Sequence, residues 1–219
     1  MNVSFIWIGS NTPSLFLNNY KNAVKLNPQH SVQLFGTRDI EHLAKLYGIL
    51  DVFSQLNLVN QVNLAKYLVL HYYPGVYSDI DIRWKVGIDG LLNDLPTKFY
   101  NEKYWPNFSW DLTCKPEWIS CVRPYVWDKE QEYCYTFDDH LIYAESGASK
   151  KLIDFCLSRL ASRDFLSNFY FEPFGPISIT KLIYNKGLIA RGWDDKQVQA
   201  NGIYCIHDST RLWDPTKII

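Results

Sequence analysis

The stretch that most constrains this chain covers residues 63–84, where a helical pattern is followed by a turn and then by two closely spaced aspartates. Apolar residues recur at spacings of three and four through its first half, which predicts one face of a helix. Pro74-Gly75 then ends the helix, because proline restricts the residue before it and glycine adopts conformations that close helices. A short extended segment follows and leads to Asp79 and Asp81.

The spacing of these two aspartates indicates a cation site. In a strand, side chains two residues apart point to the same side, so the carboxylates of Asp79 and Asp81 would face one way. They would repel each other unless a cation or a shared proton lies between them. A hard divalent ion with oxygen ligands fits, and such an ion commonly holds phosphates on its other side. Without its flanks, however, an Asp-x-Asp triplet is more often a solvated turn.

The flanking residues carry a family resemblance. Gly75-Val76-Tyr77-Ser78-Asp79-Ile80-Asp81 resembles the strand motif of the Asp-x-Asp sugar-transferase family, which includes yeast outer-chain mannosyltransferases and clostridial glucosylating toxins. That family carries an Asp and, three residues later, an Arg on the preceding helix, where this chain has Asn63 and Lys66. Pro74 replaces the family's first glycine. The N-terminal pattern is also similar to that of capsid-glycosylating domains from large algal viruses.

The resemblance implies a GT-A type of α/β fold, with a Rossmann-like, largely parallel mixed sheet flanked by helices. It implies a metal-dependent hexosyltransferase. Such an enzyme moves a hexose or deoxyhexose from a nucleoside-diphosphate sugar, preferentially UDP-linked, to a glycan or glycoprotein acceptor, with retention of configuration. Mn²⁺ or Mg²⁺ would neutralise charge on the leaving diphosphate.

Asn63 and Lys66 lie one helical turn apart, and the resemblance implies that both contact the donor sugar. The change from Asp and Arg to Asn and Lys removes a negative charge and a two-pronged donor, which leaves the sugar open. The alternative is a pair of exposed polar helix residues.

Residues 3–9 predict a buried first strand that ends in a polar turn, a common place for α/β proteins to hold a nucleotide. In the resembled family, a Trp-(Ile/Val)-Gly at this place contacts the nucleobase. The resemblance implies that role for Trp7, Ile8 and Gly9. The alternative for Trp7 is an inward-facing strand residue.

The resemblance also implies a third metal ligand near the C-terminus, because many glycosyltransferases of this architecture complete the metal shell with a late histidine. His207 follows a short apolar strand there and would join Asp79 and Asp81, with Asp208 as the fallback. A neutral nitrogen beside carboxylate oxygens suits manganese better than calcium. A structural hydrogen-bonding role for His207 is the alternative.

Asp138 and Asp139 open a predicted helix over residues 138–143, where the helix dipole favours negative charge, so plain capping explains one of them. In sugar transferases of this fold an acid at such a place touches the donor sugar or the reacting face. Asp139, ahead of Asp138, is therefore a candidate catalytic residue beside Asp79 and Asp81. Gly175-Pro176 resembles the family's late Gly-Pro, which lines the sugar pocket; a helix-start turn is the alternative.

The remaining chain predicts an α/β domain. Strands are expected at residues 31–35 and 50–53, and helices at 13–26, 38–47, 150–160 and 177–184. Residues 87–136 form an aromatic-rich, irregular segment with short strands and hairpins. The alternation of strand and helix up to Asp81 favours a largely parallel sheet, and ligands bind such sheets at the carboxyl ends of the strands.

Composition bounds the setting. A chain of 219 residues is most simply one domain, 1–219, and its net charge of −1 suggests no face for nucleic acid. Five cysteines without a Cys-x-x-Cys pair argue against zinc and against a complete disulfide framework, and fit a reducing cytoplasm. No apolar run reaches membrane-spanning length. Secretory relatives carry an anchor, so we expect a soluble version or part of a larger protein, and the viral resemblance adds a virus-encoded protein acting in the host cytoplasm.

Two other classes of function remain open. An aspartate-nucleophile phosphatase also uses Asp-x-Asp after a strand with Mg²⁺, although that motif normally follows the first strand. A non-enzymatic carbohydrate-binding module would use its aromatic residues for stacking and its carboxylates for a structural Ca²⁺.

Overall fold

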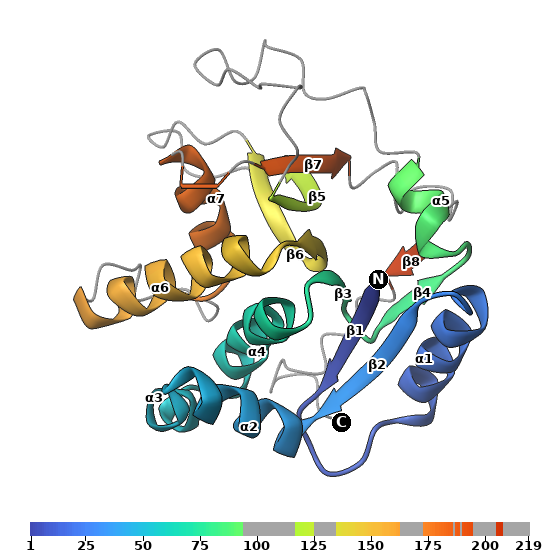
Figure 1. Ribbon diagram of the computed structural model, residues 1–219, viewed down its shortest axis with the longest axis horizontal. Coiled ribbons are helices and arrows are strands. Elements are labelled where there is room, and N and C mark those ends of the chain that lie inside the picture. Colours follow the sequence, from blue (N-terminus) through green and yellow to red (C-terminus); the bar gives the residue numbers. More distant parts are fainter. Residues whose placement is uncertain are drawn as a thin grey trace.

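The computed structural model describes residues 1–93, 117–124, 135–162, 173–185, 187–188, 190–194 and 205–207. Their strands form a six-stranded sheet of order β2-β1-β3-β6-β5-β7 and a two-stranded sheet that pairs β4 with β8 (Figure 1). The larger sheet contains β1 (Asn2–Trp7), β2 (Ser31–Gly36), β3 (Gly75–Ser78), β5 (Trp118–Pro124), β6 (Tyr135–Ala144) and β7 (Ala190–Asp194). The smaller sheet contains β4 (Ile82–Trp84) and β8 (Cys205–His207).

The larger sheet is mixed. β1 is parallel to both β2 and β3, and β5 is parallel to β7. β6 runs antiparallel to its neighbours β3 and β5. The predicted α/β architecture with a largely parallel, mixed sheet is therefore confirmed, and the reversal occurs beside β3, the strand that leads to Asp79.

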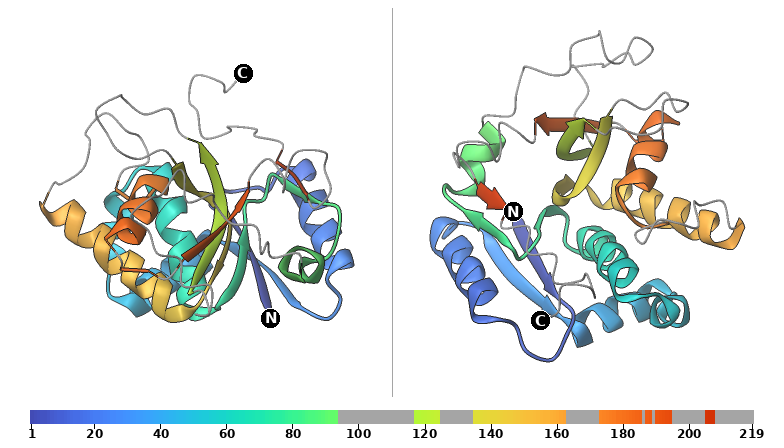
Figure 2. Two further views of the ribbon diagram at one scale, coloured as in Figure 1. Left: turned by 90° about the horizontal axis from the view of Figure 1, so that it is seen from above. Right: turned by 180° about the vertical axis from the view of Figure 1, so that it is seen from behind.

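Helices cover both faces of this sheet (Figures 1 and 2). The helices in the described residues are α1 (Ser14–Leu26), α2 (Thr37–Tyr47), α3 (Leu50–Gln55), α4 (Leu58–Tyr72), α5 (Ile88–Asn93), α6 (Ser146–Ser162) and α7 (Pro176–Tyr184). Buried residues of α2, α3, α4, α6 and α7 form one core cluster with the sheet, and those of α1 and α5 form another.

The strands divide their side chains between these two clusters. Val76 packs on the side of α1, and the next residue, Tyr77, packs on the side of α4. Leu141 and Ile142 of β6 divide in the same way, as the two-residue period of a strand requires. A strand buried on both faces reads as a continuous apolar run, so its period is lost from the sequence.

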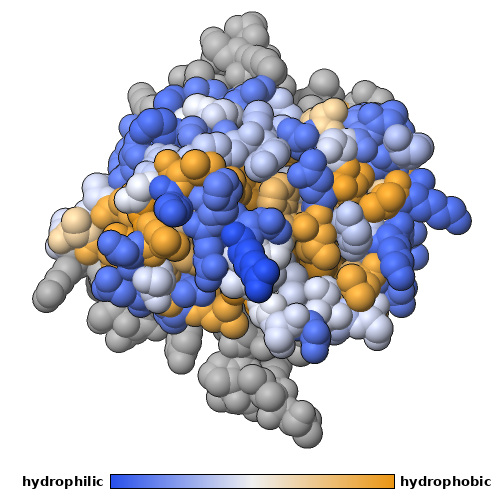
Figure 3. Space-filling model, turned by 60° about the horizontal axis from the view of Figure 1, so that its bottom comes forward, coloured by the Kyte–Doolittle hydropathy of each residue, from blue (hydrophilic) through white to orange (hydrophobic). Residues whose placement is uncertain are grey.

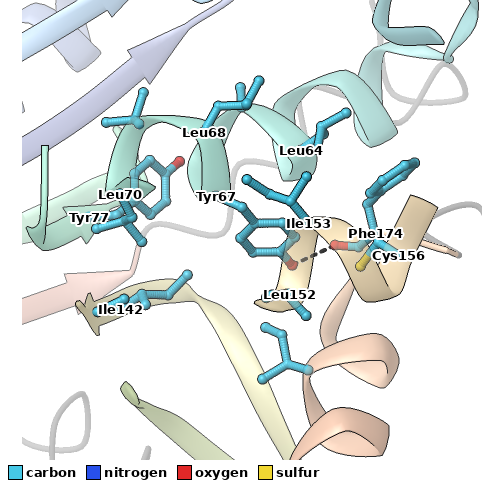
Figure 4. Packing of buried hydrophobic residues seen from close by; sticks show 14 of the residues in the cluster. Leu64, Tyr67, Leu68, Leu70, Tyr77, Ile142, Leu152, Ile153, Cys156 and Phe174 are labelled. Carbon is cyan, nitrogen blue, oxygen red and sulfur yellow. Dashed lines mark hydrogen bonds between the residues drawn. The ribbon is translucent and has the colours of Figure 1, made fainter. Parts of the chain in front are cut away.

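The core on the α4 side joins α4 to α6 and α7. Figure 4 shows Leu64 and Leu68 of α4 with Leu152 and Ile153 of α6, all of them buried. The Tyr67 hydroxyl donates a 2.5 Å hydrogen bond to the carbonyl oxygen of Phe174, which precedes α7. This buried hydroxyl therefore has a partner, and α4 is held against the segment that starts α7.

Most expected elements are confirmed, with boundaries that differ by a few residues, and two are wrong. Of the expected irregular segment 87–136, the structure describes 87–93, 117–124 and 135–136, where residues 88–93 form the helix α5 and residues 118–124 form the strand β5. Residues 50–53 lie in α3 and not in a strand, because a short apolar run has no period that separates the two structures. Residues 138–143 lie in β6 and not in a helix. Three successive polar residues, Asp138 to His140, are buried here together with the apolar residues that follow, so the polar–apolar alternation that identifies a half-exposed strand is absent.

Gly75 shows why the motif begins with glycine. Its φ is +146°, and an added Cβ would lie 2.4 Å from the carbonyl oxygen of Asn2. Asn2 pairs with Gly75 across β1 and β3, so the two backbones approach closely here. Glycine at this position therefore permits the pairing that places the end of β3 beside the end of β1.

The surface carries hydrophobic residues among hydrophilic ones on the face that Figure 3 presents. The exposed large hydrophobic residues of the described chain are Met1, Leu15, Val24, Leu46 and Leu58. Hydrophobic side chains exposed singly are ordinary on protein surfaces. None of the helices that the structure describes has the length and apolar character needed to cross a membrane.

Candidate active site around the Asp-x-Asp turn

The Asp-x-Asp motif forms a turn between β3 and β4 and does not continue the strand. β3 ends at Ser78, and the backbone N–H of Ile82 donates a 3.0 Å hydrogen bond to the carbonyl oxygen of Asp79. The side-chain amide of Asn19 on α1 donates to the carbonyl oxygen of Ile80 at 3.2 Å. The expectation that both aspartates lie on a strand was therefore wrong in its geometry, although both remain at the strand's carboxyl end.

Lys66 of α4 reaches the first aspartate of this turn. Its ammonium nitrogen Nζ lies 3.2 Å from Asp79 Oδ1 and 5.4 Å from the centre of the Tyr77 ring. The Tyr77 hydroxyl donates to the same Asp79 oxygen at 2.6 Å. Lys66 and Asn63 are only 3% and 5% exposed, so the alternative of two exposed polar helix residues is wrong.

The same ammonium contacts a second carboxylate, Asp139 Oδ2, at 3.3 Å. Asp139 lies within β6, so the expectation of acids at a helix start is wrong, and helix capping does not explain Asp138 or Asp139. Both acids are buried, at 4% and 8% exposure. The fold thus brings α4, the turn after β3 and the middle of β6 to one buried ammonium.

These contacts shift the protonation of the cluster. Burial favours the neutral amine of Lys66, but the carboxylates of Asp139, Asp79 and Asp138 outweigh it and raise the Lys66 pKa above its ordinary value. Burial raises the pKa of the Asp139 carboxyl, Lys66 opposes that shift, and Asp138 and Asp79 add to it. Burial and then Asp79 raise the pKa of Tyr77, which therefore remains a phenol that can donate.

The candidate metal ligands converge only in part. β8 runs antiparallel to β4, with His207 paired to Ile82, so the backbone of His207 lies beside the residue that follows Asp81. Among the described residues, no group of three or more His, Cys, Asp or Glu side chains is arranged to hold a metal ion. Asp208 lies outside the described residues. The roles of Asp79, Asp81 and His207 as ligands remain predictions.

The candidate nucleobase residues lie at the same edge of the sheet. β1 is parallel to β3 with Ser4 paired to Tyr77, so Trp7 at the end of β1 and Asp79 just after β3 lie toward the same end of the sheet. The buried Nε1 atom of Trp7 has no hydrogen-bond partner among the described residues. The Gly9 N–H donates to the Thr37 hydroxyl at 3.1 Å, and Ile8 packs against the α4-side core.

Gly175 and Pro176 form the N-terminus of α7, with Gly175 as the N-cap and Pro176 as the first residue. The Ser178 hydroxyl donates to the Pro173 carbonyl and accepts from the buried Arg159 guanidinium. These contacts and the Tyr67–Phe174 hydrogen bond fix the segment against α4 and α6. The helix-start interpretation is thus confirmed, and a sugar-pocket role stays a prediction.

Sequence reasoning missed three residues of this site: Asn19, Tyr77 as a partner of Asp79, and His140. The carbonyl oxygen of His140 accepts from the Asp79 N–H at 2.7 Å, and its ring nitrogen Nδ1 lies 3.3 Å from Asp138 Oδ1. Tyr77 carried a signal, since it lies two residues before Asp79 and strand residues two apart share a side. Asn19 and His140 carried none, because their contacts join distant segments.

Comparison with known proteins places this geometry in a family context. Residues 13–97 match the family model described as a glycosyltransferase sugar-binding region containing a DXD motif. This range includes α1, α4 and the Asp-x-Asp turn. A search of curated proteins gives no match.

Solved structures share the fold. A PaToxG glycosyltransferase is 15% identical to this chain and superposes with a TM-score of 0.53. The alignment covers 84% of this chain and 69% of the PaToxG chain. The ligand-free glycosyltransferase domain of the YGT toxin is 10% identical and also has a TM-score of 0.53. The alignment covers 88% of this chain and 79% of the toxin domain. The expected resemblance and fold are thereby confirmed: residues 13–97 match the DXD glycosyltransferase region, and the described chain has the fold of GT-A glycosyltransferase domains.

Proposed function

We propose that this chain is a metal-dependent glycosyltransferase that uses a UDP-linked hexose or deoxyhexose and transfers it, with retention of configuration, to a glycan or glycoprotein. The observation that carries the proposal is the contact between Lys66 and Asp79, within the segment that matches the family model. It places a buried ammonium beside the turn at the carboxyl end of β3, and ligands bind at the carboxyl ends of the strands in α/β sheets.

The charges of the cluster fit a divalent cation. Two buried or partly buried carboxylates, Asp79 and Asp139, share the single ammonium of Lys66, and Asp138 lies within the same strand as Asp139. Asp79 and Asp81 would hold Mn²⁺ or Mg²⁺ together with His207, whose backbone lies next to β4. When bound, the metal would supply electrostatic stabilisation of the leaving diphosphate.

The chain's own residues would orient the donor. Trp7, Ile8 and Gly9, at the edge where β1 ends, would contact the base, and the unpartnered Trp7 Nε1 offers a hydrogen bond. Asn63 and Lys66 would meet the sugar hydroxyls from α4, and Asp139 would face the same space from β6. Gly175 and Pro176 would form a wall of the sugar pocket.

The proposal keeps the reducing, cytoplasmic setting, since Cys121, Cys156 and Cys205 are buried thiols. A viral origin rests on the sequence resemblance alone.

A thermal-shift panel tests the function. UDP, GDP and CMP are each added with and without Mn²⁺, and we expect stabilisation only with UDP and Mn²⁺ together. A ligand at about 100 times its Kd stabilises the folded state by ~2.7 kcal/mol, which raises the Tm of a chain this size by roughly 5–10 °C. Release of UDP from a panel of UDP-sugars then identifies the donor.

The rival functions predict other outcomes. The phosphatase predicts turnover of an aryl phosphate with Mg²⁺ that disappears in Asp79→Asn. The carbohydrate-binding module predicts glycan binding that needs no nucleotide. The family match and the fold favour the transferase over both.

A further inference from the structure

The acidic segment of β6 is a bulge. Phe137 pairs with Val122 of β5, and Ile142 pairs with Ser120. Residues 138–141 of β6 therefore lie opposite the single residue Cys121. Extra residues in one strand bend it and redirect the side chains that they carry, and such bulges are frequent beside active sites. Asp139, which contacts Lys66, lies in this bulge.

The Asp138 side chain contacts two other residues of the bulge, Asp139 and His140. Asp138 Oδ1 accepts a 2.8 Å hydrogen bond from the Asp139 backbone N–H and lies 3.3 Å from His140 Nδ1. The side chains of Asp138 and His140 are 6% and 4% exposed. A buried carboxylate needs such partners, so the imidazole and the Asp139 N–H together stabilise the Asp138 carboxylate inside the bulge.

His140 connects this bulge to the Asp-x-Asp turn. Its side chain contacts Asp138, whereas its carbonyl oxygen accepts the backbone N–H of Asp79 at 2.7 Å. One residue therefore links the backbone that carries Asp79 to the carboxylate that fixes the backbone of Asp139. These are the two acids that share the Lys66 ammonium, at 3.2 and 3.3 Å.

We propose that His140 is a positioning residue for the transfer reaction: its imidazole holds the Asp138 carboxylate that fixes the Asp139 backbone, and so sets the place of the Asp139 carboxylate relative to Asp79, whose N–H is held by the main chain of the same residue. The proposal rests on the proposed glycosyltransferase function for its catalytic consequence. Its geometric consequence, the shared contact with Lys66, is independent of that function.

Two substitutions and one control test the role. His140→Leu keeps a side chain of similar volume but removes the ring nitrogens. His140→Asn keeps a nitrogen donor at the position of Nδ1. Tyr143→Phe on the same strand is the matched control. It removes a hydroxyl that donates to the Glu145 carboxylate at 2.8 Å, a contact outside the site. All proteins are compared for Tm, for Kd of UDP with Mn²⁺, and for kcat and KM of transfer.

Positioning predicts a split between binding and turnover. We expect His140→Leu to lower kcat at least tenfold while the Kd for UDP changes less than threefold, and His140→Asn to recover kcat to within threefold of wild type. Wild-type kcat in a folded His140→Leu protein would refute the role. So would kcat and Kd losses that merely follow the loss of Tm, with no rescue by asparagine.

If the wild-type protein neither binds a nucleotide nor transfers a sugar, the proposed function is refuted, but the positioning role can still be tested. Crystal structures of His140→Leu and His140→Asn then decide it. We expect Lys66 Nζ to lose contact with one of the two carboxylates in His140→Leu and to keep both in His140→Asn. Retention of both contacts in the leucine variant would overturn the proposal.

Discussion

The ammonium of Lys66 lies 3.2 Å from the carboxylate of Asp79, although the two residues come from a helix and from the turn after the next strand. The same ammonium contacts Asp139 of β6 at 3.3 Å. A buried ammonium with a raised pKa remains charged at neutral pH and compensates two acids that would otherwise repel each other. This contact is the centre of the proposed active site.

Removal of this ammonium should destabilise the fold. Lys66→Met leaves Asp79 and Asp139 without their shared cation, and we expect a loss of about 3 kcal/mol in unfolding free energy, measured by urea denaturation. Asp79 is partly exposed, which places the loss at the lower end of the range for buried pairs. Lys150→Met, which breaks the exposed pair of Lys150 with Asp154, should cost about 0.3–0.5 kcal/mol. Equal losses in the two variants would contradict the buried ion-pair assignment.

The second aspartate of the motif should control the metal-dependent part of nucleotide binding. We expect Asp81→Asn to weaken UDP binding at least tenfold when Mn²⁺ is present, because an amide is a poorer ligand for a hard cation. Isothermal titration calorimetry of UDP into each protein, with and without Mn²⁺, measures the metal-dependent binding. Asp154→Asn on α6 should behave as wild type. An unchanged Mn²⁺ effect in Asp81→Asn would remove Asp81 from the metal site.

A pair of glycines tests the approach of β1 to β3. Gly75→Ala places a Cβ 2.4 Å from the Asn2 carbonyl oxygen at a φ of +146°, so we expect a loss of at least about 2 kcal/mol in unfolding free energy or failure to fold. Gly147→Ala on α6 meets nothing within 4 Å and should change stability by less than about 1 kcal/mol. Circular dichroism melts compare the two. A mild effect of Gly75→Ala would show that the strands can separate at little cost.

Asp139 should give the fold a distinctive pH dependence. Its pKa lies above the ordinary 3.8, chiefly because of burial, so the folded state binds this proton more tightly than the unfolded state does. Its contribution to stability is full below 3.8 and is lost as pH rises through the folded pKa. As the pH rises from 3.8 through the folded pKa, the unfolding free energy of the wild type should therefore fall relative to that of Asp139→Asn. Carboxyl-carbon NMR titration measures the pKa directly, and a value at or below 3.8 would contradict the buried environment.

The sequence predicted the parts of the site that depend on local spacing. The Pro74-Gly75 break, the acidic segment after the strand, and the three-residue spacing of Asn63 and Lys66 all depend on neighbours in the chain, and the structure keeps them close together. Asp138 and Asp139 were also chosen, but for the wrong reason. Because β6 is buried on both faces, polar and apolar residues do not alternate along it as in a half-exposed strand, and the bulge that redirects Asp139 has no sequence signal.

The amino-acid sequence by itself determined the family resemblance, the α/β architecture and the identity of the acids around residue 79, because helix periods, glycine and proline positions and a short motif are local properties. Only the tertiary structure decided which acids share a cation. The contacts of Lys66 with Asp139, of Asp79 with the His140 carbonyl and of Asn19 with Ile80 each join segments far apart in the chain. Such contacts depend on strand order and on the antiparallel placement of β6, which pairing between distant strands establishes and no local pattern encodes.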